Sequence, residues 1–200
     1  AAAVPLCFLT AWHMLVTKAH VKPGEDVLVL AAGSGVGSAS IQVAKLFNAR
    51  VIATAGSDVK LEAARGLGAD EVVNHYEKDF SEEARRLTGR RGVDIVIEHV
   101  GGATWNKSIR SLAYGGRMVT CGGTSGYQGQ TDIRYVYTRQ LSILGSYVGS
   151  KRELMEVLKF VEAGKLKAVV DSTFPLERAA DAQQRMENSE HFGKIVLVPP

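Results

Sequence analysis

The chain has 200 residues, of which 46% are hydrophobic and 22% charged, and its net charge at pH 7 is +3. This is the composition of a globular domain with a sizeable core, and so small a charge argues against a nucleic-acid partner. No apolar run reaches the roughly 18 residues of a membrane-spanning helix. The two cysteines, Cys7 and Cys121, lie far apart in apolar segments, which favours free thiols and a cytoplasmic location.

The N-terminal segment, AAAVPLCFLTAWHML, is apolar but lacks the basic region that opens a signal peptide. It therefore predicts a buried helix. The chain has no initiator Met and begins in what reads as the middle of a helix, so we expect it to be a piece of a longer protein.

Beyond this helix, short apolar runs alternate with helical patterns. Strands are predicted over residues 27–31, 50–55, 71–74, 93–100, 117–123 and 140–147. Helices are predicted between them, over residues 35–47, 58–68, 79–89 and 104–116. The alternation predicts an α/β fold: a doubly wound, six-stranded parallel sheet of the Rossmann type with helices on both faces.

A short C-terminal α/β extension follows the sixth strand. Its patterns are those of a helix, a strand, a helix and a strand, over residues 151–164, 168–174, 176–186 and 194–198. Because no linker, internal repeat or low-complexity segment interrupts the chain, we predict a single domain over residues 1–200, with an N-terminal helix and this extension.

A glycine-rich loop, AAGSGVGSAS, follows the first predicted strand at residues 31–40. Glycine lets backbone N–H groups approach a pyrophosphate, and the N-terminus of the next helix adds positive partial charge. Gly33, Gly35 and Gly37 meet this need, although Ser38 stands where a G-x-G-x-x-G motif begun at Gly33 would end. We interpret the segment as a dinucleotide-binding loop; the alternative is a plain strand-to-helix turn.

The short-chain dehydrogenase pattern, G-x-x-x-G-x-G, fits less well. Gly33 and Gly37 match its first spacing, but Ala39 occupies the place of its last glycine. That class also carries Tyr-x-x-x-Lys within a helix. Tyr147 and Lys151 have this spacing, but they span a predicted strand end and a Gly-Ser turn, so we interpret the match as a coincidence.

The tip of the second strand predicts which dinucleotide binds. NAD-binding domains place an acidic residue there for the ribose 2′-hydroxyl, whereas this tip reads Ala55-Gly56-Ser57. If Ser57 caps the next helix, Lys60 falls in its first turn, where a positive charge opposes the helix dipole. We interpret Ser57 and Lys60 as a 2′-phosphate site, so NADP(H) is expected and NAD(H) is the alternative. The competing interpretation is a solvated Lys60 offset by Asp58.

Taken together, several stretches resemble the medium-chain dehydrogenase/reductase superfamily, in its zinc-containing alcohol dehydrogenase and quinone oxidoreductase group. They cover essentially the whole chain: PLCFLTAWHML, VKPGEDVLVLAAGSGVGSASIQVAKLFNARVIATAGSDVKLEAARGLGADEVVN, GVDIVIEHVGG, GGRMVTCGGTSG, RQLSILGS and HFGKIVLVPP. The family loop reads A-A-x-G-G-V-G, so Ser34 replaces one glycine here. The branch that uses NADPH often has Tyr directly after the Asn that ends the third strand. Here Asn74 is followed by His75 and then Tyr76.

The resemblance implies a set of cofactor-lining residues. Thr10 would lie beside the nicotinamide, Gly145 and Ser146 near its carboxamide, and Lys194 at the pyrophosphate. The full implied set is Thr10, Gly33, Ser34, Gly35, Val36, Gly37, Ser57, Lys60, Val100, Gly101, Cys121, Gly122, Gly145, Ser146 and Lys194.

The resemblance also implies what the chain lacks. In the superfamily, zinc and proton-relay residues come largely from an N-terminal GroES-like domain, which is absent here. The histidines and cysteines show no metal-ligand spacing, and His99, the most tempting candidate, is interpreted as structural. We therefore expect no catalytic or metal residue in this chain, and little activity from it alone. The strand at residues 140–147 would pair with its twin in a homodimer.

The predicted function is that of the cofactor-binding domain of an oxidoreductase. The full enzyme would transfer hydride between NADP(H) and a small-molecule alcohol/carbonyl or enone/quinone. A non-catalytic dinucleotide-binding or sensing module on the same fold is the alternative. A methyltransferase is disfavoured, because such enzymes usually have an acidic second-strand tip.

Overall fold

The structure is a computed structural model that describes residues 1–200. Its main sheet has six parallel strands in the order β3-β2-β1-β4-β5-β6. In chain order these are β1 (Asp26–Val29), β2 (Arg50–Ala55), β3 (Glu71–Asn74), β4 (Val93–Glu98), β5 (Leu112–Thr120) and β6 (Ser142–Gly145). The prediction of a doubly wound, six-stranded Rossmann sheet is confirmed.

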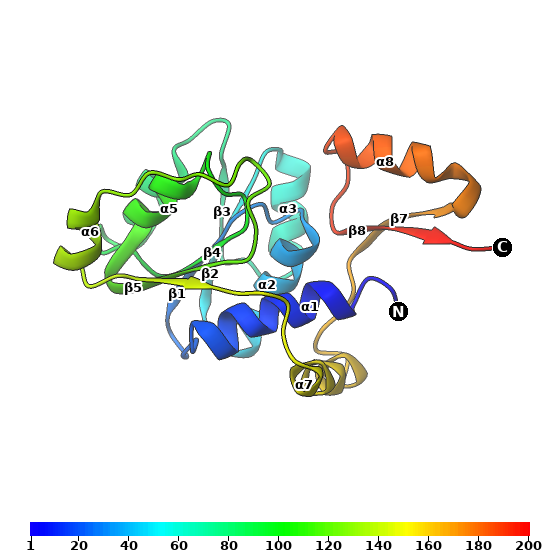
Figure 1. Ribbon diagram of the computed structural model, residues 1–200, viewed down its shortest axis with the longest axis horizontal. Helices are drawn as coiled ribbons and strands as arrows, with labels where there is room; N and C mark the ends of the chain where they lie inside the picture. Colours follow the sequence, from blue (N-terminus) through cyan, green and yellow to red (C-terminus); the bar gives the residue numbers. More distant parts are fainter.

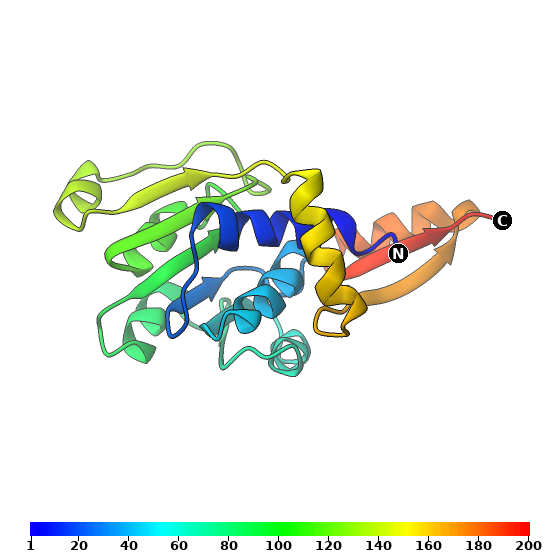
Figure 2. The same cartoon turned by 90° about the horizontal axis from the view of Figure 1, so that it is seen from below.

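Helices cover both faces of this sheet (Figures 1 and 2). The α-helices of the chain are α1 (Pro5–Trp12), α2 (Gly35–Leu46), α3 (Asp58–Gly66), α4 (Phe80–Leu87), α5 (Trp105–Ser111), α6 (Ile133–Thr138), α7 (Lys151–Glu162) and α8 (Ala179–Glu187), of which α8 packs on β7 and β8 rather than on this sheet. The larger core cluster joins α1, α2 and α7 to one face of the sheet, and the smaller one joins α4 and α5 to the other. Both faces of the central strands are thus apolar, which explains their unbroken Val/Ile/Leu runs. No helix has the length and apolarity needed to cross a bilayer.

The C-terminal extension forms a second, two-stranded parallel sheet, from β7 (Val170–Pro175) and β8 (Lys194–Val198). A 3-10 turn, Leu176–Arg178, and α8 connect the two strands. Figures 1 and 2 show this unit projecting from the main body on the side where α1 begins.

One predicted helix is too long and the strand after it too short. The helix expected over 104–116 ends at Ser111, and β5 begins at Leu112 rather than at residue 117. The reason is an irregularity in the β4–β5 register between Val93 and Ile95, opposite a turn in which Gly115 has φ +70°. Such a left-handed residue ends a helix but is accommodated in a bulged strand.

Smaller differences concern element ends and two unpredicted elements. The predicted strands over 27–31 and 93–100 end earlier, because their last residues turn away into loops at the sheet edge, and the strand predicted over 140–147 is shorter at both ends. Helix α6 was not predicted, and none of its residues is buried. The N-terminal helix continues as a π-helical segment over His13–Lys18.

Candidate cofactor site

The carboxyl ends of the parallel strands meet at one edge of the sheet, and most of the predicted site residues follow them. Register pairs place Val29 beside Ala53 and Ile97, and Thr120 beside Glu98 and Gly145. The loops that begin after these strands therefore share one edge. In open α/β sheets this edge is where ligands bind.

The glycine-rich loop presents free backbone donors at the start of α2, a helix of twelve residues. Ser34 is its N-cap, and the Ser34 hydroxyl accepts a hydrogen bond of 2.9 Å from the Gly37 N–H. The N–H groups of Gly35 and Val36 have no partner within the protein. Ser34 thus satisfies one helix-end donor and leaves two free, which fits an anion at the helix N-terminus.

Close packing explains why the loop needs its glycines. A Cβ at Gly37 would lie 2.3 Å from the Ala31 carbonyl oxygen, so this position packs α2 directly on the end of β1. A Cβ at Gly35 would lie 2.5 Å from Cys7 Sγ and 2.7 Å from Lys194 Cδ. Lys194 therefore lies at the loop. Its contact with a pyrophosphate stays a prediction.

Thr10 belongs to the helix that covers this loop. It is a buried residue of α1, which packs against α2 and carries Cys7 one turn earlier. Burial raises the pKa of the Cys7 thiol, and the positive charge of Lys194 lowers it only in part. Cys7 is thus a neutral packing group at neutral pH. The expected position of Thr10 beside the nicotinamide stays a prediction.

Ser57 and Lys60 lie together at the first turn of α3. Ser57 is the N-cap residue but its hydroxyl makes no capping hydrogen bond, and Lys60 is the third helical residue. The Lys60 ammonium donates a hydrogen bond to the Ser189 carbonyl oxygen. Burial lowers the pKa of Lys60, the charge of Asp171 partly raises it, and Arg185 lowers it further.

Tyr76 reaches the tip of β2 in spite of its displacement by one residue from the family position. A Cβ at Gly56 would lie 2.5 Å from Tyr76 Cε2 and 3.2 Å from His75 Nε2. The His75 and Tyr76 rings contact each other edge-on, with centroids 4.7 Å apart. Gly56 is therefore covered by two rings that flank the Ser57–Lys60 segment.

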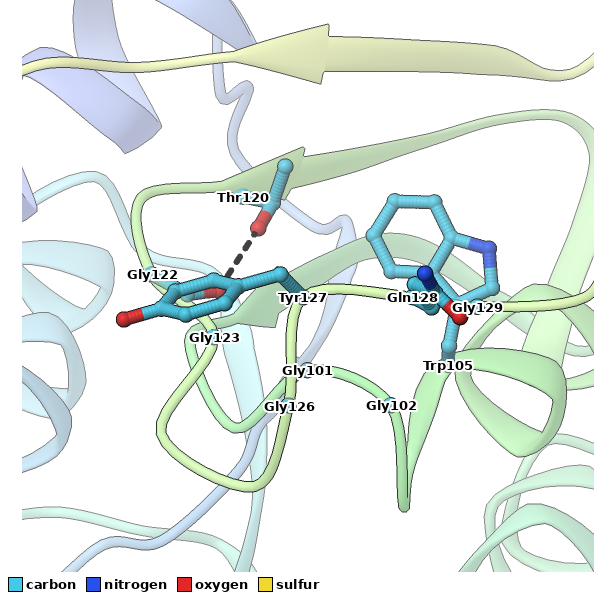
Figure 3. Close-up of a pocket in the computed structure, with 10 residues that line it drawn as sticks. All are labelled: Gly101, Gly102, Trp105, Thr120, Gly122, Gly123, Gly126, Tyr127, Gln128 and Gly129. Atoms are coloured by element: carbon cyan, nitrogen blue, oxygen red, sulfur yellow. Dashed lines mark hydrogen bonds between the residues drawn. The ribbon is translucent and has the colours of Figure 1, made fainter.

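The turns after β4 and β5 border a pocket of about 320 Å³ (Figure 3). Gly101 and Gly122, two of the predicted residues, line it. Trp105 lies at one end, where a Cβ at Gly129 would lie 2.4 Å from its Cγ, and the Tyr127 ring lies over the Gly122–Gly123 backbone at the other. Val100 and Cys121 flank the same turns, and burial, followed by the charge of Glu98, raises the pKa of the Cys121 thiol to about 11.

The end of β6 offers an unused polar group. The Ser146 hydroxyl oxygen is buried and has no hydrogen-bond partner, while its N–H donates to the Thr120 carbonyl at 2.8 Å. No atom lies within 4 Å of the position that a Cβ would take at Gly145. A buried hydroxyl without a partner is costly, so this position fits a bound polar group such as a carboxamide.

Other candidate residues have structural surroundings. His99 Nε2 lies 3.0 Å from the Leu30 carbonyl oxygen, and burial lowers its pKa while that contact and the charge of Glu98 oppose the shift. Tyr147 is 91% exposed and Lys151 is the first residue of α7, so the pair does not share a helix. No group of three His, Cys, Asp or Glu side chains is close enough to hold a metal ion. The chain's own residues therefore do not fit a zinc site.

With this geometry established, comparison with known proteins identifies the family. The profile of the zinc-binding dehydrogenase family matches residues 35–163, well over half of the chain. The chain belongs to this family. It corresponds to the nucleotide-binding domain of the family's oxidoreductases, which confirms the resemblance to the medium-chain dehydrogenase/reductase superfamily.

Individual relatives within the family are oxidoreductases. A quinone oxidoreductase of Pongo abelii is 33% identical over 98% of this chain and 61% of its own length. An NAD-dependent alcohol dehydrogenase structure is 54% identical, with a TM-score of 0.93 over 98% of this chain and 57% of that one. A 2-octenoyl-CoA carboxylase reductase in complex with NADP and 2-octenoyl-CoA is 34% identical, with a TM-score of 0.90 over 98% and 48%. The chain thus spans about three-fifths or less of these relatives.

Sequence reasoning missed two features of this zinc-binding dehydrogenase domain. One is the glycine-rich segment 122–129, which closes the pocket in Figure 3. The other is the buried carboxylate of Glu98 beneath it. The signal for Glu98 was present: a charged residue ends an apolar strand at the edge where ligands bind.

Proposed function

We propose that this domain binds NADP(H) and serves an oxidoreductase that transfers hydride between the cofactor and an alcohol/carbonyl or enone/quinone. The observation that carries the proposal is the pair of unpartnered N–H groups, of Gly35 and Val36, at the start of α2. They lie in a loop that has no room for side chains at Gly35 and Gly37. Such a site takes a pyrophosphate.

The cofactor supplies the hydride, and the residues of this chain hold it in place. Lys194 neutralises charge beside the glycine loop, where its Cδ would lie 2.7 Å from a Cβ at Gly35. The Ser146 hydroxyl, buried and without a partner, is placed to hold the carboxamide and so orient the nicotinamide ring. We expect Thr10, a buried residue of α1, to contact the nicotinamide as well.

Lys60 supports NADP(H) over NAD(H). It stands at the first turn of α3, where the β2 tip carries no carboxylate to hold a ribose 2′-hydroxyl. Relatives of both kinds exist, since one similar structure is named NAD-dependent and another contains NADP. The local chemistry of Ser57 and Lys60 favours a 2′-phosphate, which their hydroxyl and ammonium donors can bind.

Two further properties follow from the likeness to longer relatives. We expect the 200-residue chain to bind cofactor but to catalyse hydride transfer poorly alone, because the relatives it matches are considerably longer. We also expect a homodimer through residues 140–147, since β6 is an edge strand with an unpaired side.

Isothermal titration calorimetry of the purified chain, with NADPH and with NADH, tests the proposal. We expect saturable binding of both, with NADPH at least about tenfold tighter, as an added charge-assisted phosphate contact implies. Saturable binding of NADH with no preference for NADPH would refute the 2′-phosphate site. Absence of saturable binding of either dinucleotide would refute the cofactor site itself.

A further inference from the structure

The last residue of β4 is a charged residue buried at the end of an apolar strand. Glu98 is 0% exposed, and it ends a strand in which Ile95, Val96 and Ile97 are all buried. No ion pair in the structure includes it. Burial of a carboxylate without a cation is costly unless donors replace the lost water.

The donors come from the turn and helix that follow β4. Glu98 Oε1 accepts hydrogen bonds from the N–H groups of Val100, at 2.7 Å, and Gly101, at 3.0 Å. The Thr104 hydroxyl lies 3.1 Å from Oε1 and 2.9 Å from Oε2. The Ser108 hydroxyl donates to Oε2 at 2.6 Å. One side chain thus ties the strand end to the turn and to α5.

The turn after β4, which Glu98 holds, also supports the loop after β5. Gly101 has φ +94°, and a Cβ there would lie 2.5 Å from the Gly126 carbonyl oxygen. The Gly102 N–H donates to that same oxygen at 3.0 Å, and the Ser125 N–H donates to the Val100 carbonyl at 2.7 Å. Both segments border the pocket in Figure 3, with Gly101, Gly102 and Gly126 in its wall.

We propose that Glu98 is a positioning residue of the cofactor site, whose carboxylate fixes the turn after β4 in the shape that lines the bound dinucleotide. This inference rests on the cofactor site proposed above. An apolar side chain could fill the same space without the cost of burying a charge. An apolar side chain could not accept hydrogen bonds from the two consecutive N–H groups of Val100 and Gly101, and these hydrogen bonds fix the shape of the backbone there.

The geometry predicts an unusual order among substitutions. In Glu98→Gln the side chain keeps its length, so Oε1 still accepts from the two N–H groups. Its new NH₂ group can donate to the Ser108 and Thr104 hydroxyls, which rotate to accept. In Glu98→Asp the charge remains, but a carboxylate one methylene shorter cannot contact both the turn and Ser108. If Glu98 positions the turn, Glu98→Gln should therefore protect the turn and bind NADPH better than Glu98→Asp. If only the charge mattered, Glu98→Asp should be the better variant.

Two measurements on the purified chain test this order. Amide hydrogen exchange without cofactor reports protection of the Val100 and Gly101 N–H groups, and calorimetry gives the Kd for NADPH. For Glu98→Asp and Glu98→Ala we expect at least about tenfold faster exchange and at least about tenfold weaker binding, with Glu98→Gln within about threefold of the wild type. Ser111→Ala is the control: Ser111 is also buried on α5, but its hydroxyl bonds to the Lys107 carbonyl, so exchange at the turn and the Kd stay unchanged.

The outcomes separate this inference from the proposed function. Faster exchange with unchanged NADPH affinity overturns the positioning role, and so does a Glu98→Asp variant that binds better than Glu98→Gln. If Glu98→Ala does not fold, the comparison of Gln with Asp decides alone. If the wild-type chain binds neither NADPH nor NADH, the cofactor site fails and this inference fails with it.

Discussion

The Lys60 ammonium donates a hydrogen bond to the carbonyl oxygen of Ser189, so the first turn of α3 is tied to the segment that leads into β8. The two residues are 129 positions apart. The lysine that we propose for the 2′-phosphate thus has a partner within the protein. On the proposed function, the cofactor phosphate must replace or share that hydrogen bond.

Lys60→Ala is expected to weaken NADPH binding by at least about tenfold and to leave NADH binding unchanged, since only NADPH carries the 2′-phosphate. Calorimetric titration of both dinucleotides measures this. Lys165→Ala serves as a control, because Lys165 follows α7 and lies beside Leu46 at the C-terminal end of α2, opposite to the glycine loop. An equal loss for both dinucleotides would show that Lys60 acts only by holding the C-terminal segment.

Gly37→Ala is expected to destabilise the domain by about 1–3 kcal/mol, the range of overpacked positions. The new Cβ would lie 2.3 Å from the Ala31 carbonyl oxygen, so α2 must move away from β1. Gly66→Ala is the matched control within a helix, because no atom lies within 4 Å of its Cβ position. That variant should gain roughly 0.5–1 kcal/mol from the loss of a helical glycine. Chemical denaturation gives the free energy of unfolding of both variants. A Gly37→Ala variant as stable as the wild type would refute the close packing.

Glu153 is expected to stabilise the domain at neutral pH and to lose this contribution in acid. Burial alone would raise its pKa, but hydrogen bonds from Thr17, the Ser150 N–H and His13 outweigh burial and bring the pKa to about 2. Because this value lies below the ordinary 4.5, the contribution of Glu153 is complete above about pH 4.5 and is lost as the pH falls towards 2. In thermal unfolding at pH 7, 5 and 3, Glu153→Gln should therefore differ most from the wild type at pH 7 and least at pH 3. A constant difference would contradict the pKa shift.

Ile143→Lys is expected to weaken self-association at least about tenfold while leaving the thermal midpoint nearly unchanged. Ile143 is 38% exposed on β6, the edge strand of the main sheet, where a lysine opposes pairing with a second copy. Leu158→Lys on α7 is the control, because Leu158 has the same exposure of 38% away from that edge. Sedimentation velocity measures the effect; a wild-type chain that stays monomeric at high concentration would rule out the dimer.

The sequence predicted the sheet well because its two central strands, β1 and β4, contain the buried apolar runs Val27–Val29 and Ile95–Ile97. It missed α6 because a helix without buried residues has no apolar period to detect. It extended α5 too far because Leu112 and Ala113 continue the helical pattern although they belong to β5. Apolar spacing does not report a register irregularity in a neighbouring strand.

The site was only partly predictable for a related reason. Gly35 and Gly37 could be found from the loop alone, because the space they need is set by adjacent backbone. The hydrogen-bond partners of Lys60 and Glu98 could not be found from the sequence. Ser189 reaches Lys60 only through the return of the chain after β7, and the hold of Glu98 on Val100 depends on a turn that the pattern does not define.

The Gly193 N–H donates to the Gly33 carbonyl oxygen at 2.7 Å, which joins the start of β8 to the glycine loop. Residues 186–190 just before it are exposed. A ligand that binds only when the glycine loop is ordered therefore also stabilises the segment before β8 against local opening, by mass action. At a concentration of 100 times Kd the suppression is about 2.7 kcal/mol, or roughly a hundredfold. If the glycine loop binds the cofactor as proposed, the resistance of β8 to proteolysis therefore reports how much of the protein has cofactor bound at that loop.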